Sequence, residues 1–186
     1  MLLFAAKTEN KHEEASVDLD TLLQGISEGS QVALEQLYRY THSSVYSFAL
    51  SILKNTHDAE DVLHDCYVAV WYNAGNYRSQ GKPLAWMMTI TKNLCLQRIR
   101  ERGRTADIPQ EEWTLDLFND SGLTMEDKSV LSACMEQLSE QERQVVTLHA
   151  VSGFKHREIA ELLELPLSTV LSKYHRAIKR LKKHLQ

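Results

Sequence analysis

The chain has few residues that interrupt helices. Its 186 residues include seven glycines and three prolines, all at isolated positions, so few segments could form the tight turns of β-hairpins. Leu, Ala, Glu, Lys, Arg and Gln, all good helix formers, dominate the remainder. The composition therefore favours an all-α fold.

Cysteine is also scarce. Cys66, Cys95 and Cys134 are widely separated and none belongs to a CxxC pair, so we expect buried thiols in a reducing compartment. The histidines are scattered apart from His149 and His156, and no HExxH motif or Cys/His cluster with metal-ligand spacing occurs. We therefore expect neither a metal site nor a cofactor.

Long apolar runs are missing as well. No segment approaches the roughly 18 apolar residues that a membrane-spanning helix needs. The opening MLLFAAKTEN has a short apolar run with no basic residue before it, which does not resemble a secretory signal. We expect a cytoplasmic protein.

The net charge of −4 conceals strong segregation. Residues 1–77 carry four Lys/Arg against eleven Asp/Glu, whereas residues 78–104 carry seven basic residues against one acid. Residues 105–126 have six acids and no base, and after residue 164 there are six basic residues and no acid. Two basic segments in an acidic chain indicate two contacts with an anionic partner, although each alone could be a solvated helix face.

Periodicity divides the chain into two helical domains. Residues 1–17 are expected to form a flexible tail, and residues 18–103 a first domain with one long helix from about Ser30 to Asn55. Asp58 is expected to cap a second helix, and Pro83 fits the first turn of a third that ends near Gly103.

The predicted interdomain linker, residues 104–126, is acidic and aperiodic, and its aromatic residues Trp113 and Phe118 have no assigned role. Residues 127–186 form the second domain. Within it Ser139 and Glu142 have capping-box spacing, and Gly153 ends the helix that they begin.

Residues 156–185 are the most informative segment. Two helices, about 156–163 and 168–184, are joined by a short turn at Glu164-Leu165-Pro166, which is the pattern of a helix-turn-helix. A helical projection places Ser172, Arg176, Lys179 and Lys183 opposite the apolar stripe. Hydroxyl and basic side chains on such a face suit contacts with base edges and phosphates.

This segment resembles the C-terminal domain of bacterial sigma factors, specifically the two-domain extracytoplasmic-function (ECF) group. DAEDVLHDCYVAVW, residues 58–71, resembles the family's polymerase-binding helix, and residues 77–104 resemble its promoter-melting segment. The resemblance covers about residues 20–102 and 128–185. It implies sigma region 2 at 18–103 and sigma region 4 at 127–186, with core RNA polymerase (clamp and flap), promoter DNA and an anti-sigma factor as partners, and no small-molecule substrate.

The resemblance also implies three sets of site residues. The polymerase-binding set is Asp58, Glu60, Asp61, Val62, Asp65, Val68 and Trp71. The set for the −10 element is Tyr77, Arg78, Gln80, Lys82, Trp86, Lys92, Asn93, Gln97 and Arg100, in which the loop 77–82 would receive a flipped base and Trp86 could equally be a core residue. The set for the −35 element is His156, Arg157, Ser168, Thr169, Ser172, Lys173, His175, Arg176 and Lys179.

The chain departs from the family pattern at several of these positions. Gln97 stands where the family often has Asn or an acid, and Pro83 where an aromatic residue is frequent. In the expected recognition helix, Leu171 replaces a residue that is usually basic, Ser168 replaces a usual Gly, and Lys173 a frequent Arg that could read guanine with two hydrogen bonds. The promoter sequence therefore does not follow from the resemblance.

Three other interpretations stay open. A conventional helix-turn-helix regulator would bind duplex DNA without polymerase. An enzyme is disfavoured because no Ser/His/Asp grouping, P-loop or paired-carboxylate pattern stands out. A sigma-like adaptor would bind polymerase but not promoters.

Overall fold

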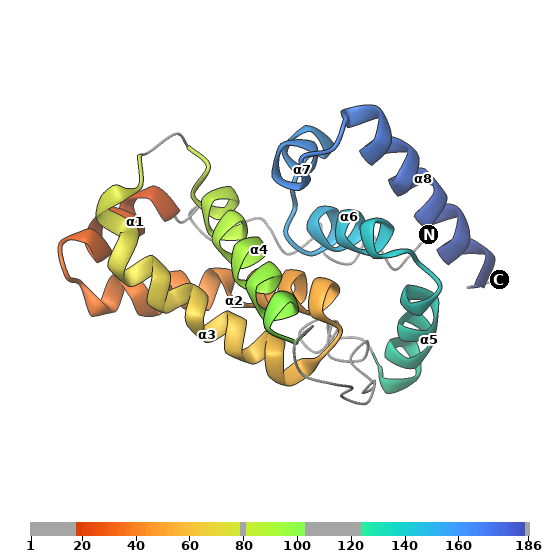
Figure 1. Cartoon of the computed structure of the whole chain (residues 1–186), viewed down its shortest axis with the longest axis horizontal. Helices are drawn as coiled ribbons and strands as arrows, with labels where there is room; N and C mark the ends of the chain where they lie inside the picture. Colours follow the sequence, from red (N-terminus) through yellow and green to blue (C-terminus); the bar gives the residue numbers. More distant parts are fainter. Residues whose placement is uncertain (1–17, 79–80, 103–123, 185–186) are drawn as a thin grey trace.

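The computed structural model describes residues 18–78, 81–102 and 124–184, and these segments are helical with no β-strand (Figure 1). The all-α prediction is confirmed. The tail, most of the linker with Trp113 and Phe118, and Gln80 lie outside the described residues. The elements are α1 (Leu19–Ser27), α2 (Gln31–Leu53), α3 (Thr56–Asn73), the 3-10 turn η1 (Ala74–Asn76), α4 (Pro83–Arg102), α5 (Met125–Glu136), α6 (Glu140–Ala150), α7 (His156–Leu163) and α8 (Leu167–His184).

Side-chain caps fix the starts of several helices. The Ser30 hydroxyl accepts a hydrogen bond from the Ala33 amide at the start of α2, as the expected boundary requires. For α3 the predicted cap is wrong. Asn55 accepts from the amide of Asp58, so the helix begins two residues before Asp58. Asn55 competes well because amide and carboxylate side chains cap helices almost equally.

Helix α1 was not expected from the sequence. Asp18 caps it, and its side chains at 22, 23 and 26 are buried. Nine residues give only two and a half turns, too few for the apolar spacing to stand out from the polar tail before it.

Helices α1 to α4 form the N-terminal unit, with α2 packed against the other three. Its core includes a polar contact, a 2.6 Å hydrogen bond between the hydroxyls of Thr41 and Tyr67. Cys66 and Cys95 are fully buried, and Cys134 is buried in the second unit. Burial raises the pKa of Cys66 to about 11 and that of Cys95 to about 12, so both thiols stay protonated at neutral pH.

Helices α5 to α8 form the C-terminal unit. Ser139 and Glu142 make the predicted capping box at the start of α6, and Gly153 takes a positive φ of 74° after that helix ends. Glu164 ends α7 in the left-handed conformation. The helices α7 and α8 therefore have the predicted helix-turn-helix boundaries to within a residue.

The two units pack against each other, α6 on α2 and α7 on α4 (Figure 1). Their buried apolar side chains form one contiguous cluster. Arg143 of α6, only 1% exposed, donates through Nε to the Ser51 carbonyl (3.1 Å) and through Nη1 to the Leu138 carbonyl. The Ser51 carbonyl is one of the last four of α2, which lack partners within the helix, so the guanidinium satisfies it.

Within the described segments, none of the helices is long and apolar enough to cross a membrane.

Candidate nucleic-acid and protein interfaces

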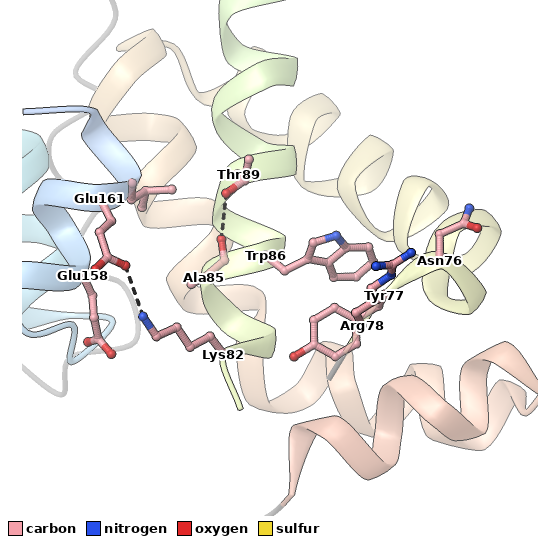
Figure 2. A pocket seen from close by; sticks show the side chains of 10 residues that line it. Asn76, Tyr77, Arg78, Lys82, Ala85, Trp86, Thr89, Glu158 and Glu161 are labelled. Carbon is pink, nitrogen blue, oxygen red and sulfur yellow. Dashed lines mark hydrogen bonds and ion pairs between the residues drawn. The ribbon is translucent and has the colours of Figure 1, made fainter. Parts of the chain in front are cut away.

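The start of α4, the turn before it and α7 line a pocket that holds aromatic side chains, two bases and two acids. A cavity of about 460 Å³ lies between η1, the N-terminal half of α4, and α7 (Figure 2). The rings of Tyr77 and Trp86 meet inside it at 5.1 Å between centroids, inclined by 47°. Arg78 and Lys82, both exposed, also line the pocket, Arg78 beside the two rings and Lys82 toward Glu161 (Figure 2). Aromatic faces with adjacent cations provide the surfaces that unpaired bases and their phosphates need.

Helix α1 holds this pocket in shape. The Tyr77 hydroxyl donates to an Asp20 carboxylate oxygen at 2.9 Å, so the ring is fixed from the side away from Trp86. Trp86 is half-buried and packs against the core. Trp86 thus has the core contact that its spacing allowed, and it also lines the pocket.

A second groove, of about 360 Å³, runs between α3 and α4. Trp86, Asn93 and Gln97 line it, and the last two side chains are exposed. The Asn93 amide therefore faces solvent and not the core. Thr91 occupies the inward position instead, donating to the Met87 carbonyl. Arg100, farther along α4, is exposed.

Two predicted DNA-binding lysines are paired with α7 in this arrangement. Lys82 lies 3.1 Å from the Glu161 carboxylate. Lys92 lies 2.6 Å from that of Glu164 and donates to the Leu162 carbonyl. The hydrogen bond and charge of Lys92 lower the pKa of Glu164. Both lysines are thus engaged by acceptor groups of the C-terminal unit.

Helix α3 presents an acidic and apolar face to solvent. Asp61 and Asp65 flank Arg98 of α4, at 3.1 and 3.9 Å, and both stay more than half exposed. Val68 and Tyr72 continue the same helical column, 42% and 78% exposed. Acidic groups beside apolar side chains suit a basic helical surface of a partner protein.

The other polymerase-binding candidates are placed differently. Asp58 is buried and ion-paired with Arg102, and Val62 is a core residue at 1% exposure. Trp71 is half-buried against the core, whereas Glu60 is exposed. Asp58 and Val62 therefore position the face made by Asp61, Asp65, Val68 and Tyr72.

The outer face of α8 is open to solvent. Ser168, Ser172, His175, Arg176 and Lys179 are exposed, and Thr169 and Lys173 are half-buried. Some of these groups also have internal partners. The Ser172 hydroxyl donates to the Thr169 carbonyl, and Arg176 donates to the Ser172 carbonyl.

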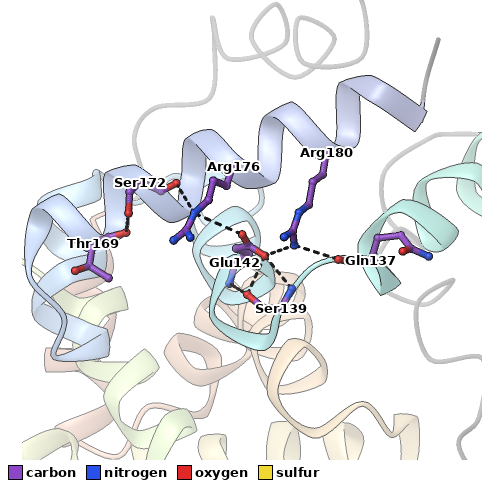
Figure 3. A network of polar contacts seen from close by, with 7 residues as sticks. All are labelled: Gln137, Ser139, Glu142, Thr169, Ser172, Arg176 and Arg180. Carbon is purple, nitrogen blue, oxygen red and sulfur yellow. Dashed lines mark hydrogen bonds and ion pairs between the residues drawn. The ribbon is translucent and has the colours of Figure 1, made fainter.

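A buried carboxylate below α8 links its basic residues to α6 (Figure 3). Glu142 Oε2 lies 2.8 Å from Arg180 and accepts from the Ser139 amide, and Oε1 lies 3.9 Å from Arg176. Burial raises the pKa of Glu142, but the Ser139 hydrogen bonds and the two guanidinium charges outweigh it and lower the pKa overall. The sequence did not indicate Arg180 as a structural residue, because it projects with the basic face.

Two histidines and a tyrosine pack together where α6, α7 and α8 meet. His149 and His156 stack at 4.5 Å, and Tyr174 meets both rings edge-on. His156 is half-buried here, whereas Arg157 beside it is exposed. Of the −35 candidates, His156 is thus placed inside the fold.

Several partners of the site residues were missed by the sequence reasoning. Arg98, Glu161 and Glu164 stand opposite predicted site residues, and they were missed because their partners lie on other helices. The one signal for such contacts in the sequence was the segregation of charge, because the acids nearest to α8 along the chain all precede Leu165.

Two family models match the chain: Sigma-70 region 2 over residues 37–105, and Sigma-70, region 4 over residues 128–181. The ECF RNA polymerase sigma factor SigK of Mycobacterium tuberculosis (strain ATCC 25618 / H37Rv) is 27% identical over 174 residues, covering 90% of this chain and 93% of its own. The protein of the same name from Mycobacterium sp. (strain KMS) is 28% identical, with 90% of each chain covered.

Two solved structures share the fold. The structure of CnrH in complex with the cytosolic domain of CnrY matches with a TM-score of 0.65 at 22% identity, over 91% of this chain and 97% of that one. The sigma factor RpoE in complex with the anti-sigma factor NepR from Bartonella quintana matches with a TM-score of 0.64 at 21% identity, over 81% and 95%.

Proposed function

The chain belongs to the sigma-70 family and carries its regions 2 and 4, and we propose that it directs core RNA polymerase to specific promoters as an ECF-type initiation factor. In this role region 4 reads the −35 element, and region 2 reads and helps to melt the −10 element. The chain acts in the cytoplasm, as a binding protein without a catalytic centre of its own.

The Tyr77–Trp86 pocket is the observation that carries this proposal. A conventional helix-turn-helix regulator reads duplex DNA and needs no surface for unpaired bases. Here two aromatic rings, with Arg78 and Lys82 beside them, stand next to the N-terminal turn of α4. Stacking on aromatic rings stabilises each unpaired base by about 1–3 kcal/mol, enough to favour an opened strand.

Polymerase docking is assigned to α3. The exposed column of Asp61, Asp65, Val68 and Tyr72 faces away from the core. It offers both charge and apolar area to the clamp of the polymerase. Glu60 lies at the edge of this column.

An anti-sigma factor is a further proposed partner. The fold is shared with CnrH and RpoE, which were solved with the cytosolic domain of CnrY and with NepR. In this chain the exposed apolar side chains of α3 and α4, Val68, Tyr72 and Leu96 among them, would become covered in such a complex.

The proposal is tested with the full chain and bacterial core RNA polymerase on DNA whose −10 region is already unpaired. We expect Arg78→Ala with Lys82→Ala to weaken binding of this DNA at least tenfold, because two phosphate contacts are lost. Arg39→Ala, which removes an exposed arginine of α2, is the matched control and should leave binding unchanged.

Tight, sequence-specific binding to duplex DNA without polymerase, together with no effect of the double variant, would instead support the conventional regulator.

A further inference from the structure

Two exposed leucines lie at the N-terminal end of α8. Leu167 is the first residue of this helix and Leu171 follows one turn later, and each is 37% exposed. Residues four apart share a face of a helix, so the two side chains form a continuous apolar ridge. The ridge lies apart from the buried stripe that contains Val170 and Ala177.

The surroundings of the ridge indicate its partner. Ser168 and Ser172 form the next column, and the exposed bases Arg176 and Lys179 follow toward the C-terminus. No acid occurs after Glu164. An apolar ridge on an otherwise basic helix fits duplex DNA better than it fits a second apolar protein surface.

The polar side chains nearby are partly engaged inside the protein. The Ser172 hydroxyl donates to the Thr169 carbonyl at 2.9 Å, and Arg176 contacts the Ser172 carbonyl and Glu142. The two leucines stay exposed as apolar side chains at this end of α8.

We propose, on the basis of the sigma-factor function inferred above, that Leu167 and Leu171 select thymine in the −35 element by packing against its 5-methyl group. The N-terminal residues of a recognition helix reach base edges in the major groove. Thymine is the base that presents a methyl group there. A leucine over guanine or adenine would leave N7 without a donor, which disfavours those bases.

The experiment removes only the methyl group. The −35 element is first selected from random duplexes with the holoenzyme, and each thymine is then replaced singly by deoxyuridine. For the wild-type chain we expect one or two positions at which deoxyuridine weakens holoenzyme binding about threefold or more, the value expected for one buried methyl group. Leu171→Ala and Leu167→Ala should each lose this sensitivity at one position. Val130→Ala, an exposed apolar residue of α5, should retain it.

Equal binding to thymine and deoxyuridine templates by the wild-type chain would overturn the proposal. Unchanged sensitivity in both leucine variants would overturn it too. If the leucine variants instead lose affinity for core polymerase without DNA, the ridge is a protein contact and the proposal is wrong. In all three cases the wild-type chain would still support promoter-specific transcription, whereas failure of the sigma-factor function would abolish the selection itself.

Discussion

Glu142 performs two tasks with one carboxylate. It closes the capping box of α6 through Ser139, and it holds Arg180 of α8 at 2.8 Å while only 3% exposed. A buried carboxylate is costly unless its hydrogen-bond capacity is filled. The recognition helix is therefore tied to α6 through a polar contact beneath its basic face.

Substitution of Glu142 separates the two tasks. Glutamine can still cap α6 but cannot neutralise Arg180, so we expect Glu142→Gln to destabilise the C-terminal unit by about 1 kcal/mol and Glu142→Ala by about 2–3 kcal/mol. Hydrogen exchange of the α6 and α8 amides in the full chain measures both.

The pKa of Glu142 is lowered by folding, so its stabilisation is present at neutral pH and is lost as the pH falls through that lowered pKa. The difference between wild type and Glu142→Gln should shrink as the pH falls below the ordinary glutamate pKa of about 4.3 and disappear below the lowered pKa of folded Glu142. A difference in stability that persists in acid would show that Glu142 does not stabilise the fold through its charge.

His156 makes stability depend on pH in a higher range. Burial and the neighbouring His149 and His175 lower its pKa. The unfolded chain therefore takes up a proton near the ordinary histidine value of about 6.5 before the folded chain does, and stability falls as the pH drops below about 7. Urea unfolding at pH 7.5 and 5.5 should show a smaller loss for His156→Gln than for wild type. The same loss in both proteins would exclude this residue as the cause.

At the scale of single helices, the acidic residues of α3 fall into two groups, one buried and one exposed. Asp58 faces Arg102 inside the fold, whereas Asp61 and Asp65 hold Arg98 at the surface and remain exposed. Exposed ion pairs contribute little to stability, about 0–1 kcal/mol. The two surface acids are therefore available to a partner without a large cost to the fold.

A matched set of variants tests this division. We expect Asp61→Asn with Asp65→Asn to weaken the complex with core polymerase at least tenfold, because a charge-complementary contact is lost. Arg98→Ala removes the same ion pairs but keeps the acids, and should bind polymerase as well as wild type does. The thermal stability of both variants should change little. If Arg98→Ala weakens polymerase binding as much as the double variant does, the ion pairs and not the exposed carboxylates are responsible for that binding.

The helices that carry a local signal in the sequence were predicted from that signal. Apolar periodicity predicted α2, the capping box at Ser139 predicted α6, and the turn at residues 164–166 predicted α7 and α8. Helix α1 escaped because its short apolar stripe is meaningful only when packed on α2.

The candidate site was predicted only in part. The family resemblance named Tyr77, Lys82 and Trp86 as DNA-binding residues; all three line one pocket, and their role stays a prediction. The acids of α7 opposite them could not be predicted, because they arrive through packing between the two units. Val62 was predicted as a contact although periodicity also allowed a core role, and burial decides for the core.

At the scale of the whole molecule, the two helical units are in contact through α6 and α7, which we call the closed arrangement. Arg143 joins α6 to the end of α2, and Glu161 and Glu164 of α7 cover two lysines of α4. We infer that these pairs favour contact between the two units at α7, and that an anionic ligand of α4 would compete with them for Lys82 and Lys92.

Neutralising the two glutamates should favour separation. Exposed ion pairs contribute little each, so Glu161→Gln with Glu164→Gln should raise the ratio of open to closed molecules roughly two- to thirtyfold. Small-angle X-ray scattering of the full chain should then give a larger radius of gyration. Glu158→Gln, which removes a charge from the same helix but none of these pairs, is the control. An unchanged radius in the double variant, with wild type insensitive to salt, would show that the pairs do not hold the units together.

Mapping of transcription start sites tests the central account most directly. Bacterial core RNA polymerase, alone and with the full chain, transcribes genomic DNA, and the 5′ ends of the products are sequenced. The account predicts start sites that depend on the chain and share two common upstream elements, near −10 and −35. No start sites beyond those of core polymerase alone would contradict it.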